Sequence, residues 1–533
     1  MSEEFRMFGP PGTGKTTRLT QYVKRGAELY GSDGVVVASF TRAAAVELQG
    51  RDLPLNPTHV GTLHALCYRA LDKPTIAETM ITEFNESQTL FQLSGGRIDI
   101  DEPEQVYDTE SDRLFAEYQV LRARLVRAND WPPLAKKFGY AWDSWKAETG
   151  YIDFTDMVEL AISMRVPPPD GAQIGFFDEV QDFTALELKL IRQWGESLDR
   201  IVLAGDDDQC IYGFKGASPR AFLEPPIPDG DPHKEVLAQS YRMPSAIHEV
   251  TQDWIGGVRG PREPKPFSPR DYTGSVEQRP GLRYKDAISL VNEAIDRSND
   301  GHSVMLLAAC SYQVAPIVQE LRNRGALFHN PYRRKRGDWN PLSPGRGRSS
   351  GQRLASLLAF DRSVWGDEAR DWTYADLIDW LPLVKKSGVF RRGATTSLDS
   401  QFPEMTISGP ALAALFEDGA VDEIRRSPLE WVGRHMAAPK ARGLSYPLHV
   451  ARQQGAAALV SGTPNIVVGT IHSVKGGEAD DVYLMPDVSP AGHVQWLNTG
   501  TRDDVLRQFY VGMSRAKERL VLCGQSQTSA VTW

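Results

Sequence analysis

Near the start of the chain stands Gly9-Pro10-Pro11-Gly12-Thr13-Gly14-Lys15-Thr16-Thr17, which fits the pattern G-x-x-x-x-G-K-[ST] of a phosphate-binding loop. In such a loop the glycines let backbone N–H groups close around phosphate oxygens, and the helix that follows directs its positive end toward them. We expect Lys15 to reach the β- and γ-phosphates and the Thr16 hydroxyl to bind a Mg²⁺ ion. The loop predicts a nucleoside triphosphate site. Many unrelated functions use such a site, so the rest of the chain must distinguish them.

The composition is that of an ordinary soluble globular protein. The chain has 533 residues, of which 41% are hydrophobic and 24% charged, and its length predicts about three or four domains. No apolar run approaches the roughly 18 residues of a membrane span, and no signal-peptide pattern precedes the loop. The four cysteines lie far apart without paired spacing, which argues against a zinc site or disulfides and favours the cytoplasm. The net charge of −9 neither indicates nor excludes a nucleic-acid partner.

Several short apolar runs end in small or polar residues, which is the pattern of parallel strands buried on both faces. In the first part of the chain the runs are residues 35–38, 174–177 and 201–204. In the later part they are residues 304–307, 466–468, 482–485 and 520–522. Because ligands collect at the carboxyl ends of such strands, the polar clusters that follow the runs are candidate sites. The pattern predicts two α/β domains, the second without a phosphate loop of its own.

An acidic motif, Asp178-Glu179-Val180-Gln181-Asp182, directly follows one of these runs. A carboxylate there can hold Mg²⁺, and its neighbour can accept a proton from the water that attacks the γ-phosphate. An adjacent Asp-Glu pair is more often a solvated surface turn. Its place after a buried strand, downstream of a phosphate loop, favours the catalytic interpretation. Gln209, beyond the next run, is a candidate γ-phosphate sensor, and Arg242 and Arg515 are candidate arginine fingers.

Two segments interrupt the strand pattern. The first covers residues 72–150 and contains a helical pattern whose apolar stripe is Leu114, Tyr118, Leu121 and Leu125. We expect Trp131-Pro132-Pro133 to end that helix. The second segment covers residues 331–454 and opens with Tyr332-Arg333-Arg334-Lys335-Arg336. Residues 331–353 hold seven Arg or Lys against one acid, a local charge of +6, and sequence alone favours phosphate contact and a merely solvated loop about equally.

Further motifs follow in order along the chain. They are Ser39-Phe40-Thr41-Arg42-Ala43-Ala44-Ala45, Gly61-Thr62-Leu63-His64, Ile152-Asp153-Phe154-Thr155-Asp156-Met157, Gly205-Asp206-Asp207-Asp208-Gln209-Cys210-Ile211-Tyr212-Gly213-Phe214-Lys215-Gly216-Ala217, Ser240-Tyr241-Arg242, Gly469-Thr470-Ile471-His472-Ser473-Val474-Lys475-Gly476-Gly477-Glu478 and Tyr510-Val511-Gly512-Met513-Ser514-Arg515-Ala516-Lys517. With the phosphate loop and the acidic motif, this set resembles the UvrD/Rep-type superfamily 1 DNA helicases. The segment from Gly205 to Ala217 is the most diagnostic.

The resemblance implies an α/β fold of two RecA-like parallel-sheet motor domains with two inserted, mainly helical accessory domains. It implies a first motor domain at residues 1–71 and 151–230, a second at 231–330 and 455–533, and accessory domains at 72–150 and 331–454. It further implies an enzyme that uses ATP and Mg²⁺, moves 3′→5′ along single-stranded DNA and unwinds duplex DNA. It names no protein partner.

The resemblance also implies roles for individual residues. The catalytic residues are Lys15, Asp178, Glu179, Gln209, Arg242 and Arg515. Nucleotide binding involves Gly9 to Thr17 together with Tyr241 at the adenine, Glu478 at the ribose, Arg242 and Arg515, and the metal ligands are Thr16 and Asp178. The single-strand track comprises Phe40, Thr41, His64, Tyr212, Phe214 and His472, and the basic segment adds Arg333, Arg334, Lys335 and Arg336. Aromatic faces suit such a track because any base can stack on them.

The chain departs from the family pattern in four places. No glutamine lies among the eight residues before Gly9, so the family's adenine-reading glutamine motif is missing. The segment from Leu307 to Ser311 lacks the family's usual arginine, and Phe214 replaces the usual tryptophan. The family's strand-separating hairpin usually follows the last arginine motif. Here the sequence ends at Trp533, so we expect a shortened hairpin or one supplied elsewhere.

Two alternatives to the helicase stay open. One is a translocase that strips proteins from DNA but unwinds poorly, which the missing hairpin favours. The other is a non-catalytic DNA-binding subunit of a larger complex. The presence of Lys15, Glu179 and Arg515 argues against the second alternative, since a motor that has lost its activity usually lacks one of them.

Overall fold

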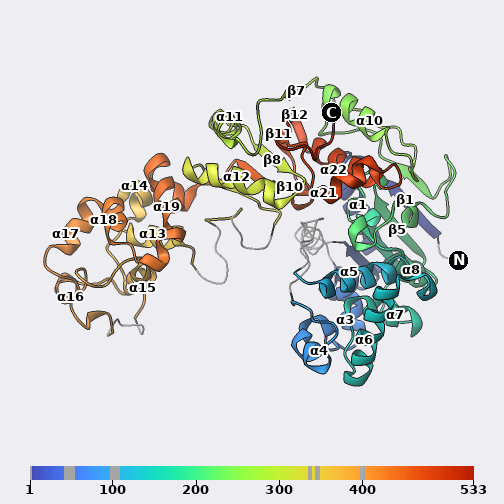
Figure 1. Cartoon of the computed structure of the whole chain (residues 1–533), viewed down its shortest axis with the longest axis horizontal. Coiled ribbons are helices and arrows are strands. Elements are labelled where there is room, and N and C mark those ends of the chain that lie inside the picture. The colour runs from blue at the N-terminus through green and yellow to red at the C-terminus, as the bar shows by residue number, and fades with distance from the viewer. Residues whose placement is uncertain are drawn as a thin grey trace. The chain divides into compact units, whose positions relative to one another are not determined.

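The computed structural model describes residues 3–40, 55–95, 108–333, 339–342, 348–396, 398 and 402–533 (Figure 1). The chain folds into two compact units. The first unit comprises residues 1–277, 488–520 and 529–533, and the second comprises residues 278–487 and 521–528.

The first unit is built on a parallel sheet that has six strands among the described residues, in the order β3-β2-β4-β5-β1-β6. The strands are β1 (Glu3–Phe8), β2 (Val35–Ser39), β3 (Val60–Gly61), β4 (Ile174–Asp178), β5 (Arg200–Gly205) and β6 (Lys234–Val236). All three apolar runs predicted in this part of the chain are strands. We predicted that the first motor domain ends at residue 230, but β6 pairs with β1, so the sheet extends beyond that residue.

Both faces of this sheet are covered by helices, which explains the continuous apolar runs. Val36 and Ala38 share a core with residues of α3 (Leu63–Ala70), α7 (Phe154–Ser163), α8 (Ala185–Gly195) and α9 (Pro219–Leu223). Val35 and Val37 share the opposite core with α1 (Lys15–Tyr30). The first unit also contains α10 (Ser245–Ile255), α21 (Pro490–Leu497) and α22 (Arg502–Met513).

The first inserted segment is helical, as predicted. It contains α4 (Ile81–Ser87), α5 (Glu110–Ala123) and α6 (Pro133–Thr149) around a core of their own. The predicted helix end at Trp131-Pro132-Pro133 is wrong. The helix α5 ends at Ala123, shortly before Leu125 takes a positive φ of 58°, and Pro133 is the first residue of α6.

The second unit contains most of a second sheet, whose order among the described residues is β7-β12-β11-β8-β10-β9. The strands are β7 (Ser275–Arg279), β8 (Val304–Ala308), β9 (Phe328–His329), β10 (Ile466–Thr470), β11 (Ala479–Leu484) and β12 (Ala516–Cys523). They include the four apolar runs predicted in the later part of the chain. The division between the units runs through β7 and β12, so residues 488–520, predicted in the second motor domain, group with the first unit.

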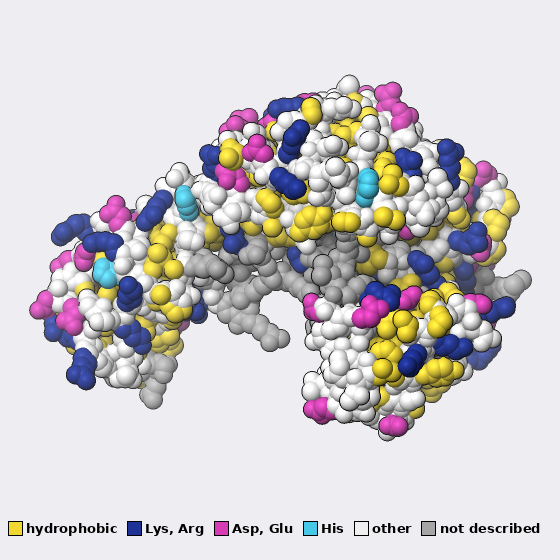
Figure 2. Space-filling model, viewed as in Figure 1, with side chains coloured by type: hydrophobic (Ala, Val, Ile, Leu, Met, Phe, Trp, Pro, Cys, Tyr) yellow, Lys and Arg dark blue, Asp and Glu magenta, His cyan; other side chains and the backbone are white. Residues whose placement is uncertain are grey.

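Helices α11 (Ala287–Asn299) and α12 (Ser311–Asn323) accompany this sheet, and the second inserted segment is also helical. Its helices are α13 (Ser350–Leu357), α14 (Arg362–Trp365), α15 (Tyr374–Trp380), α16 (Gly409–Leu415), α17 (Ala420–Arg426), α18 (Pro428–His435) and α19 (Ala441–Gln454), followed by α20 (Ala458–Ser461). Among the described residues, no helix has the length and apolar character needed to cross a membrane. On the face shown in Figure 2, basic and acidic side chains are interspersed.

Candidate functional site

The predicted phosphate loop connects β1 to α1 and has the geometry of an anion cradle. Gly12 and Gly14 have φ values of 74° and 78°, which a residue with a Cβ rarely adopts. The Thr13 hydroxyl donates to the carbonyl of Pro10 at 2.8 Å, and Gly14 immediately precedes the first residue of the 16-residue helix α1. The loop therefore presents backbone N–H groups and a helix N-terminus at one point, which suits a phosphate.

The Ser240-Tyr241-Arg242 motif packs directly on this loop. The Ser240 hydroxyl donates to the carbonyl of Pro11 at 2.9 Å, and the Tyr241 N–H donates to the carbonyl of Gly12 at 2.8 Å. A Cβ at Gly12 would lie 2.4 Å from the Cβ of Arg242, so only glycine allows this approach. The contact brings one candidate arginine finger to the loop. It also leaves the Tyr241 side chain, 74% exposed, beside it.

The acidic motif begins at the end of β4, next to the loop. Glu179 has a positive φ of 55°, and its Oε1 lies 3.3 Å from Nζ of the buried Lys15. Burial by itself lowers the pKa of Lys15, but the carboxylates of Glu179, Asp178 and Asp206 offset that effect and the net shift of the pKa is upward. The ammonium group is therefore held charged inside the protein, as a phosphate-binding lysine must be.

A series of hydrogen bonds joins Glu179 to Arg515. Gln181 Nε2 donates to Glu179 Oε2 at 2.6 Å, and Gln181 Oε1 accepts the N–H of Asp206 at 2.9 Å. Asp206 Oδ2 accepts from Gln209 Nε2 at 2.8 Å, and Gln209 Oε1 accepts from Arg515 Nη2 at 3.1 Å. Arg515 is 2% exposed. All five residues of the series lie in motifs quoted from the sequence, and three of them, Glu179, Gln209 and Arg515, had predicted roles. The linking role of Gln181 and Asp206 was not predicted.

Two cations lie against the three aspartates that precede Gln209. We call this set, Asp206, Asp207, Asp208, Lys265 and Arg262, the motor cluster. Lys265 Nζ lies 2.8 Å from Asp206 Oδ1 and 3.3 Å from Asp208 Oδ2 and also pairs with Asp207, while Arg262 Nε donates to Asp208 Oδ1 at 2.7 Å. Burial raises the pKa of Asp206, but Lys265 and Lys15 reverse this and the net shift is downward. Burial raises the pKa of Asp207 to about 6.

An aromatic group forms around Tyr212, which follows the motor-cluster aspartates in the chain. The ring centroids of Phe40 and Tyr212 are 4.8 Å apart, and those of Tyr212 and Phe214 are 5.9 Å apart. Phe40 and Phe214 are half-buried, but Tyr212 is only 2% exposed. The prediction that Tyr212 lines a base-stacking track is therefore not supported, because its ring is packed between its neighbours. Phe214, predicted to stack on bases, retains an accessible part.

A second aromatic pair lies at the predicted contact His64. Its Nδ1 lies 3.4 Å from Oε1 of Glu187, and its ring meets Phe154 edge-on with centroids 6.1 Å apart. Phe154 is 47% exposed. Phe154 was quoted from the sequence only within a motif and had no predicted role. Its exposure makes it a further candidate stacking surface.

The second unit carries the remaining predicted residues. Glu478 is exposed just before β11, whereas His472 is 3% exposed, so the prediction that His472 lines the track is not supported. The guanidinium of Arg333 lies 4.0 Å from the ring centroid of Trp339. Thr41, Arg334, Lys335 and Arg336 lie outside the described residues.

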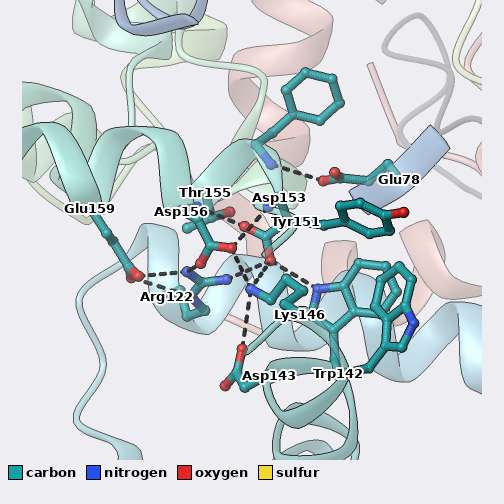
Figure 3. Close-up of polar contacts among 12 residues, drawn as sticks. Glu78, Arg122, Trp142, Asp143, Lys146, Tyr151, Asp153, Thr155, Asp156 and Glu159 are labelled. Carbon is teal, nitrogen blue, oxygen red and sulfur yellow. Dashed lines mark hydrogen bonds and ion pairs between the residues drawn. The ribbon is translucent and has the colours of Figure 1, made fainter. Parts of the chain in front are cut away.

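A further set of charges, built around the buried Arg122, Lys146 and Asp153, joins the first inserted segment to α7 (Figure 3). We call these three residues, together with Asp156 and Glu159, the insertion cluster. Arg122 Nη1 lies 2.8 Å and Lys146 Nζ 2.7 Å from Asp153 Oδ2, and Asp153 also caps α7 through the N–H of Asp156. Burial raises the pKa of Asp153, but the two cations outweigh burial and lower it. No sequence prediction involved this set as a whole.

The residues predicted to hold Mg²⁺ do not form a metal site by themselves. Among the described residues, no group of three or more His, Cys, Asp or Glu side chains could hold a metal ion. A Mg²⁺ ion bound with substrate phosphates needs only one or two protein ligands. Asp178, 2% exposed at the end of β4, and Thr16, in the first turn of α1, fit that arrangement.

Known proteins resemble the chain at both of its ends. The sequence model described as the UvrD/REP helicase N-terminal domain matches residues 3–225, and that of the UvrD-like helicase C-terminal domain matches residues 465–523. The Bacillus subtilis protein YjcD is 25% identical over 236 residues, which cover 40% of this chain and 31% of YjcD. ATP-dependent DNA helicase UvrD1 of Mycobacterium tuberculosis is 24% identical over 289 residues, 47% of this chain and 37% of that relative.

These alignments span only about a third of the length of the relatives. The two domain models together cover just over half of this chain. They include the phosphate loop, the acidic motif, the motor-cluster aspartates and Arg515, the elements that the structure brings together in the first unit. The chain belongs to the UvrD/Rep-type family of superfamily 1 helicases.

Proposed function

We propose that the chain is a DNA-dependent ATPase that moves 3′→5′ along single-stranded DNA and unwinds duplex DNA. The observation that carries the proposal is the hydrogen-bonded series from Glu179 to Arg515. It joins a candidate general base, a candidate γ-phosphate sensor and a candidate arginine finger within one compact unit. A protein that only bound nucleotide would not need these three groups in one network.

ATP is the proposed substrate. The N–H groups of the phosphate loop and Lys15 hold its phosphates, and the exposed ring of Tyr241 beside the loop stacks on the adenine. Glu478 is proposed to contact the ribose. Thr16 and Asp178 would hold Mg²⁺, which when bound neutralises charge on the transferring phosphoryl group.

Hydrolysis is assigned to the charged residues around the loop. Glu179 takes a proton from water while the water oxygen bonds to the γ-phosphorus and the bond from that phosphorus to the β–γ bridging oxygen breaks. Arg242 and Arg515 stabilise the negative charge that develops on the transferring group. Because Arg515 is 2% exposed, its charge is poorly screened by water and acts strongly at short range.

Movement on DNA is assigned to the loop that follows the sensor. Phe214 lies five residues after Gln209, so a shift at the γ-phosphate can displace a base-stacking ring. Phe40 and Phe154 offer further accessible rings, and stacking on them does not depend on base identity. The basic segment from Arg333 to Arg336 is proposed to contact DNA phosphates.

A translocase that displaces proteins without efficient unwinding is the second candidate, and a non-catalytic DNA-binding subunit is the third. The complete network from Glu179 to Arg515 favours the first two over the third.

Three substrates separate these functions when the protein is given ATP and Mg²⁺: a duplex with a 3′ single-stranded tail, the same duplex with a 5′ tail, and a tailed strand blocked by streptavidin. Unwinding of the 3′-tailed duplex alone supports the proposal, and preference for the 5′ tail overturns its polarity. Streptavidin displacement without unwinding supports the translocase. DNA binding with no hydrolysis supports the non-catalytic subunit. The Glu179→Gln variant is the negative control.

A further inference from the structure

Lys265 is a buried lysine that none of the recognised motifs contains. It lies in the irregular, proline-rich segment between α10 and β7, and its side chain is 3% exposed. Its ammonium group contacts all three aspartates of the motor cluster. Removing a lysine from water is costly, and three aspartates in sequence repel one another unless a cation lies among them.

The three aspartates have different surroundings. Asp207 accepts the N–H of Glu263 at 2.9 Å, and Asp208 accepts from Arg262. Asp206 instead connects inward to the site, because its Oδ2 accepts from the side-chain amide of Gln209. Burial raises the pKa of Asp206 and Lys265 is the largest influence that lowers it, so the ammonium keeps this carboxylate ionised.

An ionised Asp206 determines how the Gln209 amide points. A carboxylate only accepts hydrogen bonds, so it takes the NH₂ group of Gln209. The carbonyl oxygen of the same amide then faces Arg515 Nη2, which only donates. A protonated or displaced Asp206 would allow the amide to turn, and two donors would then face each other at Arg515.

We propose that Lys265 is a positioning residue for ATP hydrolysis: it anchors Asp206, which fixes the Gln209 amide and thereby the guanidinium of Arg515. This inference rests on the proposed function, because it assumes that Gln209 and Arg515 act on ATP. Lys265 does not itself touch the reacting atoms. Displacing reacting groups by about 1 Å can reduce a rate by about 10²-fold, so a loss of that size is expected when the anchor is removed.

Lys265 could instead serve only to stabilise the fold. A double variant distinguishes that structural role from the positioning role. Lys265→Met leaves the aspartates with too little positive charge and is expected to destabilise the fold. Lys265→Met/Asp207→Asn removes one negative charge as well. An asparagine oxygen can still accept the N–H of Glu263, so this variant regains stability while Asp206 stays without its anchor.

Lys234 provides the matched control. Its side chain is 4% exposed and its Nζ lies 2.6 Å from Glu263 and 2.7 Å from Asp229, but it makes no contact with the three aspartates among the described residues. Lys234→Met tests what the loss of a comparably buried lysine does by itself, at a site whose carboxylate partners are more exposed.

The experiment measures kcat and KM for ATP at saturating oligothymidylate, together with thermal unfolding. We expect Lys265→Met/Asp207→Asn to lower kcat by about 10²-fold or more with KM changed by less than about threefold. Lys234→Met should keep kcat within about threefold of wild type, and Lys265→Arg, which retains the charge, should recover most of the lost rate. The inference is overturned if the double variant has near wild-type kcat, or if Lys234→Met lowers kcat equally.

The same assay distinguishes this failure from failure of the proposed function. A wild-type protein that hydrolyses no ATP in the presence of DNA contradicts the proposed function. A wild-type protein that is active, with Glu179→Gln inactive and the double variant unimpaired, contradicts only the role of Lys265.

Discussion

The motor cluster and the insertion cluster are alike in composition and differ in where their hydrogen bonds lead. Each places two cations among at least three carboxylates, and in each a lysine contacts more than one aspartate. The insertion cluster closes on itself, because its aspartates cap α7 and accept from α5 and α6. The motor cluster continues through Asp206 and Gln209 to Arg515.

The charges of the insertion cluster hold helices together, whereas we propose that those of the motor cluster orient groups for hydrolysis. A buried ion pair contributes little net stability on average, but removing one partner leaves an uncompensated charge and is strongly destabilising. Loss of a cation from the insertion cluster should therefore be seen mainly in stability. Loss of Arg515, which ends the hydrogen-bonded series that leads from the motor cluster, should be seen mainly in the rate of hydrolysis.

The largest expected effect is the loss of ATP turnover on substitution of Arg515. Arg515→Ala removes a candidate arginine finger, and such a residue contributes about 10³–10⁵ in rate. We expect kcat to fall by that factor while nucleotide affinity changes far less, as measured by steady-state turnover and by titration with a fluorescent ATP analogue. Arg519→Ala, four residues further along the chain, breaks the pair between Arg519 of β12 and Glu277 of β7 and is the control. Equal losses of affinity and turnover at Arg515 would indicate a structural role.

For the insertion cluster we expect the opposite result, a loss of stability with little change in turnover. Arg122→Met leaves Asp153 and its neighbours short of a cation and is expected to cost about 3–5 kcal/mol of unfolding free energy. Turnover per folded molecule, measured well below the unfolding transition, should stay near that of the wild type. Arg113→Ala on the same helix removes solvent-exposed pairs with Glu110 and Glu117 and should leave stability nearly unchanged. A stable Arg122→Met protein with lost turnover would reverse the roles of the two clusters.

Phe214 tests whether the loop that follows Gln209 contacts DNA. Phe214→Ala should lose about 1–3 kcal/mol of single-strand affinity in a binding titration, with DNA-free ATPase unchanged. Its buried neighbour Tyr212 is the comparison, because Tyr212→Ala should instead cost about 3–5 kcal/mol of stability. If Phe214→Ala melted as early as that variant and bound single strands normally, Phe214 would be a packing residue.

The smallest expected effect is a pH dependence beside the insertion cluster. Burial, and next the charge of Asp153, raise the pKa of Glu78 from 4.5 to about 7. The folded protein thus binds this proton more tightly than the unfolded chain does, so stability falls as pH rises through that interval. Glu78→Gln cannot ionise and should be more stable than wild type at pH 8 by about 1–3 kcal/mol, with little difference at pH 4.

Thermal unfolding at the two pH values measures this difference. Glu86→Gln, at an exposed glutamate on the same inserted segment, is the control. A Glu78→Gln protein that behaves in the same way as Glu86→Gln would exclude Glu78 as a source of the pH dependence.

Sequence patterns predicted the strands and the phosphate loop because burial on both faces of a sheet requires continuous apolar runs. They failed at the end of α5, because Leu125 takes a positive φ that no local residue choice marks. The catalytic candidates Lys15, Glu179, Gln209 and Arg515 were predictable from motifs with fixed spacing. Lys265 was not, because its partners lie far away in sequence and its own proline-rich segment contains no recognised motif.

The solvent exposure of individual side chains was the other property that could not be predicted from the sequence. Tyr212 and Phe214 are two residues apart in one motif, yet one is buried and the other half-buried. That difference depends on the packing of Phe40 against the loop, a contact between distant segments. Motifs indicate which residue types reach a site, and packing decides which side chains remain accessible.

Steady-state ATP hydrolysis with and without single-stranded DNA, for the wild type and for Glu179→Gln, tests the central claim most directly. The account predicts wild-type turnover that rises strongly on addition of oligothymidylate, and a Glu179→Gln protein that binds ATP but turns over about 10²–10⁴-fold more slowly. Hydrolysis that does not respond to single-stranded DNA, or a Glu179→Gln protein with near wild-type turnover, would contradict it.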